Sequence, residues 1–241
     1  MNSQTSKQPD NVDPTEINKF SELASRWWDP ESEFKPLHQI NPLRLDFIQQ
    51  RTPLEGLSVL DVGCGGGILC ESMAALGASV SGIDMAEAGL NVAKMHGIES
   101  GISVEYQQIT AEKLANEQPG QYDVVTCLEM LEHVPNPSSI VNACSQLAKP
   151  SGAIYFSTLN RTPKSFAFAI VGAEYVLQLL PKGTHQYEKF IKPSELNRWA
   201  ELEGLQLKEM IGMHYNPLFK SYSLGKGLDV NYLAYYRKTN G

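Results

Sequence analysis

The clearest pattern along the chain is an alternation of short apolar, β-branched runs with longer segments whose apolar residues recur at helical spacing. This alternation begins at Ser58 and continues to about Leu159. Because parallel strands need helical crossovers, it predicts a mostly parallel α/β sheet with helices on both faces. Seven strands are expected, at Ser58–Val62, Ser79–Ile83, Val104–Gln107, Tyr122–Cys127, Ala153–Leu159, Leu205–Met213 and Asn231–Arg237.

Helices are expected before the first strand and between the strands. Asp13 and Glu16 flank Pro14 with the spacing of a helix cap, and apolar residues follow at helical spacing, so a first helix begins there. Pro42 is expected to open a second helix, because proline is tolerated in a helix's first turn. This second helix is predicted at Leu43–Gln50. The remaining predicted helices are Ile68–Leu76, Ala86–Glu99, Ser138–Ala148 and Pro193–Leu202.

This pattern places one domain at residues 13–241, after a disordered tail at residues 1–12. The domain carries an N-terminal helical cap, residues 13–52, and an apolar insert, residues 161–189. Within the insert, Ser165 to Leu180 is too short to span a bilayer and is flanked by Arg161, Lys164 and Lys182. Two interpretations stay open: an interfacial helix on anionic headgroups, and a lid over a substrate pocket. His185 could likewise line a pocket or lie in an exposed loop.

The charge and cysteine content excludes several classes of protein. Twenty Lys and Arg residues against 27 Asp and Glu give a net charge of −7, so the chain lacks the basic field of a nucleic-acid binder. The four cysteines have neither CxxC spacing nor neighbouring histidines, which argues against a zinc site or a disulfide framework. The polar N-terminus lacks the apolar core of a signal peptide, so we expect a cytoplasmic bacterial protein.

A glycine loop, Gly63-Cys64-Gly65-Gly66-Gly67, follows the first predicted strand and opens a helix. Open α/β sheets bind ligands beyond the carboxyl ends of their strands, and glycine lets the backbone approach a ligand closely. A dinucleotide fingerprint would place glycine where this chain has Ile68, and Asp61 offers a carboxylate to a cationic ammonium rather than to a pyrophosphate. The alternative is a plain tight turn.

The second strand ends at Asp84, about twenty residues after the loop. A carboxylate at this position can accept hydrogen bonds from both ribose hydroxyls of an adenosine. A helix cap is the alternative, because Asp is common at helix N-termini. In combination with the glycine loop, the sequence favours a nucleoside ligand.

The segment from Val59 to Gly67 resembles motif I of class I methyltransferases, which have a Rossmann-like fold. Six further segments resemble the family of ubiquinone-biosynthesis O-methyltransferases, along nearly the whole chain. They are Arg26–Asp29, Glu33–His38, Asn41–Leu45, Glu129–Pro135, Ser157–Arg161 and His214–Pro217.

The resemblance implies S-adenosylmethionine as co-substrate and methylation of two hydroxyls on polyprenylated quinone precursors of the catechol type. It implies donor contacts at Arg44, Gly63, Asp84 and Leu128, to which the glycine loop adds Asp61 and Gly65. Arg44 could pair with the donor's carboxylate, or it could be a helix-surface arginine. Residues 108–111 lack the Asp that many relatives direct at the adenine, so adenine recognition stays open. A biosynthetic complex and peripheral attachment to the inner face of the bacterial inner membrane are further expectations.

Candidate catalytic residues follow the fourth predicted strand. Methyl transfer requires a positioned acceptor oxygen that loses its proton, and an unperturbed phenol has a pKa of about 10. Glu129, Glu132 and His133 have i, i+3, i+4 spacing and would share one face of a helical turn. His133 could be the general base, or the three could ligate a divalent cation such as Mg²⁺, as eukaryotic relatives of the family imply. A purely structural role for all three is the alternative.

Three competing functions remain at this point. The first is a methyltransferase for another lipid or a small phenol. The second is a nicotinamide oxidoreductase, which the missing glycine at Ile68 disfavours. The third is a non-catalytic donor-binding subunit, which the acidic segment around His133 disfavours.

Overall fold

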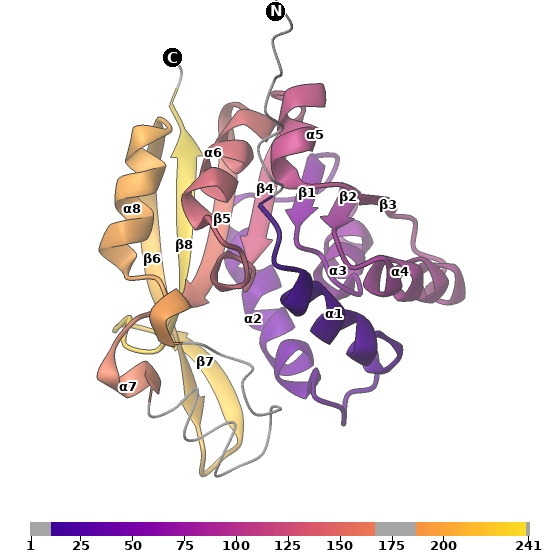
Figure 1. Cartoon of the computed structure of the whole chain (residues 1–241). Helices are drawn as coiled ribbons and strands as arrows, with labels where there is room; N and C mark the ends of the chain where they lie inside the picture. The colour runs from indigo at the N-terminus through magenta and orange to yellow at the C-terminus, as the bar shows by residue number, and fades with distance from the viewer. Residues whose placement is uncertain (1–10, 167–186, 240–241) are drawn as a thin grey trace, which may run out of the picture.

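The structure, a computed structural model, describes residues 11–166 and 187–239, which form an eight-stranded sheet with helices on both faces (Figure 1). The strand order is β3-β2-β1-β4-β5-β8-β6-β7. The first five strands of this order pair in parallel, and β8, β6 and β7 pair antiparallel. The strands are β1 Ser58–Val62, β2 Ser79–Asp84, β3 Glu105–Gln108, β4 Tyr122–Leu128, β5 Ala148–Leu159, β6 Leu205–Asn216, β7 Ser221–Gly225 and β8 Asn231–Lys238.

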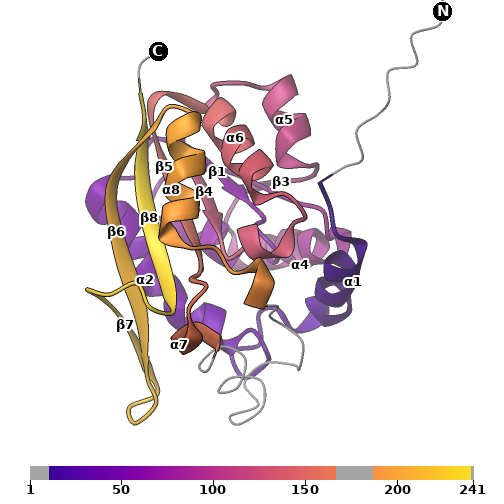
Figure 2. The same cartoon turned by 60° about the vertical axis from the view of Figure 1, so that its left-hand side comes forward.

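Helices α2, α3 and α4 pack on one face of the sheet, and α5, α6 and α8 pack on the other (Figure 2). Phe47, Ile48 and Met73 fill the first layer, and Leu114, Val141 and Leu196 fill the second; all six are buried. The helices are α1 Pro14–Leu23, α2 Lys35–Arg51, α3 Ile68–Ala75, α4 Glu87–Ser100, α5 Ala111–Glu117, α6 Pro137–Leu147, α7 Pro163–Ser165 and α8 Pro193–Leu202, with short 3₁₀ helices at Ala24–Arg26, Leu131–His133 and Tyr187–Lys189.

The predicted α/β class and mostly parallel sheet are confirmed, but the sheet has eight strands rather than seven. The additional strand is β7, which pairs with the end of β6. Its sequence, Ser-Tyr-Ser-Leu-Gly, is short, and its two serines are exposed, so it lacks the apolar run that marked the other strands. Helix α5, of seven residues, is also absent from the prediction because it is too short to show a helical period.

The prediction that Pro42 opens the second helix is wrong. Helix α2 begins at Lys35, with Pro36 in its first turn, and continues through Pro42. Proline in a helix interior removes one hydrogen bond, which usually ends the helix. Here tertiary contacts on both sides hold the segment helical, because Ile40 and Phe47 are buried and the Asn41 side chain donates to Ser72.

The structure confirms the predicted start of the first helix but not the predicted end of the disordered tail. Helix α1 begins at Pro14, and Asp13 accepts a hydrogen bond from the Thr15 amide, as predicted for a cap. The disordered tail was predicted to reach residue 12, but Asn11 exchanges hydrogen bonds with the backbone of Asn136 and donates to Glu112. Residues 1–10 of the predicted tail lie outside the described residues.

Most of the predicted apolar insert also lies outside the described residues. The structure describes Ser165 and Phe166 at its start, and it leaves out residues 167–186, which contain the rest of Ser165 to Leu180 as well as His185. Among residues 11–166 and 187–239, no helix is long and apolar enough to cross a membrane.

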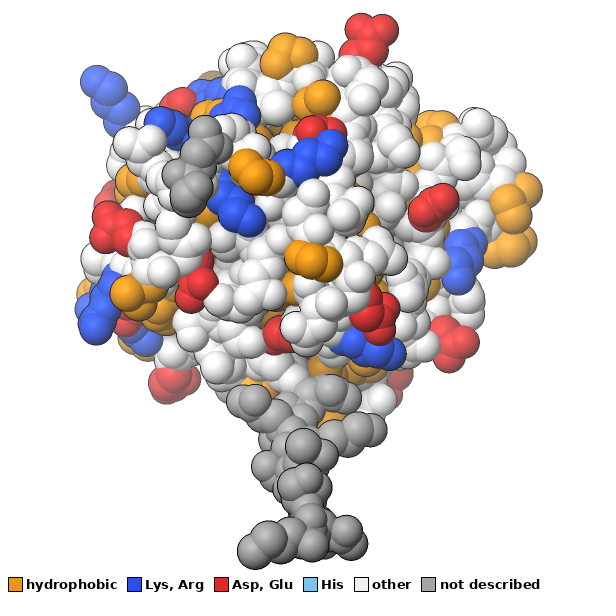
Figure 3. Space-filling model, turned by 90° about the horizontal axis from the view of Figure 1, so that it is seen from above, with side chains coloured by type: hydrophobic (Ala, Val, Ile, Leu, Met, Phe, Trp, Pro, Cys, Tyr) orange, Lys and Arg blue, Asp and Glu red, His pale blue; other side chains and the backbone are white. Residues whose placement is uncertain are grey.

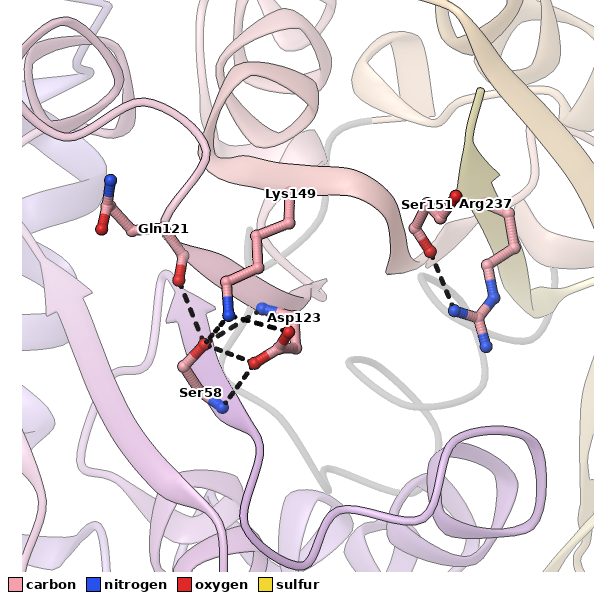
Figure 4. Close-up of polar contacts among 6 residues, drawn as sticks. All are labelled: Ser58, Gln121, Asp123, Lys149, Ser151 and Arg237. Atoms are coloured by element: carbon pink, nitrogen blue, oxygen red, sulfur yellow. Dashed lines mark hydrogen bonds and ion pairs between the residues drawn. The ribbon is translucent and has the colours of Figure 1, made fainter. Parts of the chain in front are cut away.

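The amino ends of the parallel strands form the end of the molecule seen in Figure 3, where charged side chains of both signs are interspersed with separate hydrophobic ones. A polar cluster joins three of these strand ends (Figure 4). Asp123 of β4 accepts hydrogen bonds from the Ser58 amide and hydroxyl and from Lys149. These contacts fix the strands at the edge opposite to the carboxyl ends, where the candidate site lies.

Candidate active site

A cavity of about 850 Å³ lies at the carboxyl edge of the parallel strands, and residues of α1 and α2 line part of it. Its volume is within the range of about 300–1,000 Å³ that is typical of small-molecule sites. All nine of the predicted site residues line this cavity, namely Arg44, Asp61, Gly63, Gly65, Asp84, Leu128, Glu129, Glu132 and His133. The strand topology brings them together from α2 and from the ends of β1, β2 and β4.

The glycine loop is held close to the sheet and is covered by a tryptophan. The amides of Gly63 and Cys64 both donate to the Ile83 carbonyl. Gly65 has a positive φ of 53°, and a Cβ at this residue would lie 2.1 Å from the Trp27 ring. The position therefore requires glycine for its backbone conformation and for the close approach of the indole.

The neighbouring Trp28 fixes the same loop from outside. Its indole N–H donates to the Gly66 carbonyl at 2.9 Å, and its ring stacks on His96 of α4 with centroids 3.4 Å apart. The His96 ring in turn contacts the buried carboxylate of Glu71. The tryptophan pair thus connects the segment after α1 to the glycine loop and to both flanking helices.

Asp84 ends β2 and organises the loop from the other side. One carboxylate oxygen accepts a hydrogen bond from the Gly65 amide at 2.9 Å, and the other accepts from the Ala86 amide at 2.8 Å. Burial raises the pKa of Asp84, and the two amide donors oppose this shift. The sequence left ligand binding and helix capping open; the structure shows a carboxylate that joins loop and helix start while it faces the cavity.

Asp61 is buried at the end of β1. It accepts hydrogen bonds from the Thr126 hydroxyl at 2.6 Å and from the Cys70 thiol at 3.4 Å. Burial raises its pKa from 3.8 to about 6, although these two bonds and the charge of Arg44 lower it. A carboxylate that is costly to ionise because it is buried is well suited to receive a cation, because the cation would stabilise the ionised form.

The raised pKa of Asp61 predicts how the binding of a ligand with an ammonium group depends on pH. An ammonium group bound at Asp61 would favour the carboxylate, so affinity should be highest above pH 6 and should fall as Asp61 takes up a proton at lower pH. We expect binding about tenfold weaker at pH 5 than at pH 7.5. Calorimetric titration with S-adenosylhomocysteine measures this, and the same titration of Asp61→Asn should show a flatter profile. A profile equally steep in both proteins would contradict the role of Asp61.

Arg44, on α2, is a buried cation with unused hydrogen-bonding capacity. Its Nη2 lies 3.2 Å from Glu129 Oε1, in an ion pair that lacks hydrogen-bond geometry. Within the described residues, neither Nε nor Nη2 has a hydrogen-bond partner. The alternative of a helix-surface arginine is wrong, because only 6% of the residue is exposed. A carboxylate in the cavity would satisfy both free donors at once.

The sequence predicted that Glu129, Glu132 and His133 share one face of a helical turn. The structure shows that they do not. Glu129 has a positive φ of 54°, and a 3₁₀ helix begins only at Leu131, so the i, i+4 relation is broken. Glu129 contacts Arg44 and accepts from Asn231 and Ser157, whereas Glu132 accepts from Thr158. Among the residues that the structure describes, no group of three or more His, Cys, Asp or Glu could hold a metal ion. The arrangement of these residues does not fit the Mg²⁺ site that the sequence left open as an alternative.

Glu132 is buried, and burial together with the charge of Glu129 raises its pKa to about 7. A side chain that is partly protonated near neutral pH can donate as well as accept hydrogen bonds. It fixes the segment that carries His133 to β5 through the Thr158 hydroxyl at 2.7 Å.

His133 is held by a residue from the N-terminal helix. Its Nδ1 lies 2.8 Å from Glu16 Oε2, and the edge of its ring packs against Phe20 with centroids 5.2 Å apart. The hydrogen bond to His133 lowers the pKa of Glu16, although burial opposes it. When Nδ1 donates to this carboxylate, Nε2 is the ring atom left to accept a proton.

Glu16 is the main site residue that the sequence did not indicate. Its position three residues after Asp13 suggested a capping box, yet its carboxylate bonds to a residue 117 positions away. Asn231 of β8 is a second, because its side-chain amide donates to both oxygens of Glu129. Neither partner could be found by a local motif, since each pair joins segments that are more than 100 residues apart in the sequence.

The position where adenine recognition was left open also lies on the cavity wall. Ile109, Thr110 and Ala111 line the cavity beside Asp84 and Met85. This part of the wall combines apolar side chains with Thr110 and Glu112, and it adjoins the carboxylate at the end of β2.

Comparison with known proteins finds methyltransferases both among family models and among individual relatives. A family model described as a methyltransferase domain matches residues 29–209. The ubiquinone biosynthesis O-methyltransferase of Bordetella bronchiseptica is 64% identical over 229 residues, which cover 95% of this chain and 95% of that protein. The protein of the same name from Dechloromonas aromatica is 62% identical over 223 residues, which cover 92% and 96%.

Among solved structures, magnesium protoporphyrin IX methyltransferase from Synechocystis PCC 6803, with bound S-adenosylhomocysteine, superposes with a TM-score of 0.69. The match covers 92% of this chain and 95% of that one at 18% identity. At this identity the likeness concerns the fold, which is therefore that of Rossmann-like methyltransferases.

Proposed function

This chain belongs to the family of ubiquinone biosynthesis O-methyltransferases, and we propose that it methylates two ring hydroxyls of polyprenylated catechol-type intermediates, 2-polyprenyl-6-hydroxyphenol and 3-demethylubiquinol. The methyl donor is S-adenosylmethionine. One observation carries the proposal: the free donors of Arg44, the carboxylates of Asp61 and Asp84, and the His133 ring all face one cavity.

The donor is proposed to lie along the glycine loop. Asp84 receives the ribose hydroxyls, Asp61 the ammonium group, and Arg44 the carboxylate, for which it exchanges its present contact with Glu129. Gly63, Gly65 and Leu128 line the same stretch of the cavity. Carboxylates outnumber cations here, which suits a positively charged sulfonium.

The acceptor is proposed to lie beside His133. Its hydroxyl proton passes to Nε2, the phenolate oxygen attacks the methyl carbon, and the carbon–sulfur bond breaks with its electron pair left on S-adenosylhomocysteine. The protein mainly aligns oxygen, carbon and sulfur, and such alignment can contribute several kcal/mol. Glu129 and Glu132 are proposed to support this wall rather than to take the proton.

Glu16 is proposed as the positioning residue for His133. Replacing Glu16 with Gln should lower kcat about tenfold, because the imidazolium formed in the reaction loses its anionic partner, and should leave the KM for the donor within a factor of two. Steady-state kinetics check this. Glu22→Gln is the matched control, since Glu22 lies exposed on the same helix. Equal kinetics in the two variants would contradict the role.

We also propose that the enzyme works at the surface of the inner membrane, on its cytoplasmic side, and within a biosynthetic complex. A polyprenyl tail partitions into the bilayer, so an enzyme that acts on the attached ring must reach that surface. The segment Ser165 to Leu180, most of which lies outside the described residues, is proposed to contact this surface. Lys164, next to it, already lines the cavity.

The proposed function is tested by the choice of acceptor. Purified protein is incubated with S-adenosylmethionine and equal concentrations of a prenylated and a short-chain catechol in detergent micelles, and products are identified by mass spectrometry. We expect faster methylation of the prenylated catechol. Faster methylation of the short-chain catechol would instead identify a small-phenol methyltransferase.

A further inference from the structure

The turn between β6 and β7 exposes two large apolar side chains side by side. Leu218 and Phe219 are 81% and 73% exposed, and the hairpin projects from the carboxyl-edge end of the molecule in both views (Figures 1 and 2). Single exposed apolar residues are common on soluble proteins, but an adjacent exposed pair at a projecting tip is typical of a contact surface.

The tip has a defined backbone conformation. The side-chain oxygen of Asn216 accepts hydrogen bonds from the amides of Leu218 and Phe219, at 3.0 and 3.2 Å. An asparagine that accepts from the backbone two residues later forms a side-chain-stabilised turn. The turn therefore presents the two apolar side chains outward.

Behind the tip stands a pair of tyrosines. Tyr215 and Tyr222 are partners in the β6–β7 ladder, with ring centroids 4.8 Å apart. Tyrosine is enriched at membrane–water interfaces, where its ring meets the apolar boundary and its hydroxyl stays hydrated. Tyr215, Tyr222 and Pro217 also line the cavity, so the cavity reaches the base of the hairpin.

The charge of this segment is opposite to that of the chain. Residues 210–228 contain Lys220 and Lys226 and neither Asp nor Glu, whereas the chain has a net charge of −7. Lys220 directly follows the apolar pair, so its ammonium is placed to contact anionic headgroups around that pair. At the opposite end of the molecule, charges of both signs are mixed (Figure 3).

From these features we propose that the β6–β7 tip, Leu218 and Phe219 with Lys220, is a lipid-binding element that inserts into the headgroup region of an anionic bilayer and places the cavity mouth at the membrane surface. This inference rests on the proposed function in one respect: a substrate with an apolar tail would enter the cavity from that surface. Vesicle binding itself requires no catalysis.

Vesicle sedimentation tests the proposal on the full-length protein. Vesicles contain phosphatidylcholine alone or with phosphatidylglycerol. Leu218→Ser with Phe219→Ser should lower the partition coefficient on phosphatidylglycerol vesicles about tenfold. The matched control is Ile98→Ser with Leu202→Ser, because those residues are 77% and 74% exposed on α4 and α8. The control should bind within twofold of the unmodified protein.

A second measurement reports insertion directly. All four native cysteines are buried, so Phe219→Cys can be labelled selectively with an environment-sensitive fluorophore. Its emission should shift to the blue on phosphatidylglycerol vesicles, and the same label at Ile98→Cys should not shift. Methylation of a short, soluble catechol is measured in parallel; its absence from all proteins would refute the proposed function while the vesicle data still decide the inference.

Two results would overturn the inference. One is equal vesicle binding by the tip and control variants together with no emission shift at residue 219. The other is a tip variant that loses self-association, measured by light scattering, without a change in vesicle binding; a second copy of the chain would then be the occupant of this surface.

Discussion

Replacement of His133 with Ala should lower kcat about 10²- to 10⁴-fold, the usual contribution of a general base, while the affinity for S-adenosylhomocysteine stays within threefold. The reason is geometric: Glu16 holds Nδ1 and leaves Nε2 to take the acceptor's proton, whereas the charged groups assigned to the donor lie on β1, β2 and α2. Steady-state kinetics and calorimetry measure the two quantities separately.

An acceptor with a more acidic hydroxyl tests whether His133 removes a proton or only packs against the acceptor. A catechol that carries a nitro group ionises near neutral pH, so it needs no base, and His133→Ala should recover most of its rate with this acceptor. His133→Gln keeps a side-chain amide that can donate to Glu16, which controls for the burial of an unpaired carboxylate. Equal losses with both acceptors, or full activity of either variant, would refute His133 as the base.

Replacement of Asp61 with Asn should weaken binding of the donor and at the same time raise the stability of the fold. The loss of the carboxylate should weaken binding of S-adenosylhomocysteine about 10- to 100-fold, because a buried charged hydrogen bond to the ammonium is lost. Burial raises the pKa of Asp61 from 3.8 to about 6, so its ionised form opposes folding. The variant should gain on the order of 1–3 kcal/mol in unfolding free energy at pH 7.5.

The pH dependence of this gain follows from the direction of the shift. A carboxyl whose pKa is raised on folding costs stability as pH rises through the interval between the two values, and costs nothing below it. The gain from Asp61→Asn should therefore be largest above pH 6 and should vanish below about pH 3.8. Thermal unfolding across this range measures it, and unchanged donor affinity with unchanged stability would contradict the account.

Asp123→Asn is the matched control for Asp61→Asn. Asp123 lies at the other end of the strands (Figure 4), where hydrogen bonds from Lys149 and Ser58 outweigh burial and leave its pKa lowered. Its ionised form supports folding, so this variant should lose stability at neutral pH. Donor binding should not change, because Asp123 does not line the cavity.

The sequence predicted most of the sheet and the donor side of the site, for a physical reason. Buried parallel strands appear as continuous apolar runs, and the carboxyl ends of adjacent strands meet at one edge. Asp61 and Asp84 therefore had to converge once their strands were recognised. Leu128, at the end of β4, followed from the same logic.

The acceptor side could be predicted only in part, because its contacts join distant segments. His133 was identified from its neighbours, but its partner Glu16 comes from α1. The prediction that Glu129 and His133 share a helical face is wrong because Glu129 has a positive φ, which the spacing of residues alone cannot reveal. Tertiary packing also explains the wrong prediction at Pro42. A proline at this position usually ends a helix, but packing against the rest of the protein keeps α2 continuous through it.

The central claim is that the cavity transfers a methyl group from a donor on the glycine loop to a ring oxygen beside His133. Its most direct test is one turnover with S-adenosylmethionine carrying a deuterated methyl group and a prenylated catechol, analysed by mass spectrometry. We expect one labelled methyl on a ring oxygen for each S-adenosylhomocysteine formed, at least 10²-fold more slowly in His133→Ala. Tight donor binding with no labelled product would contradict the claim and indicate a non-catalytic donor-binding protein.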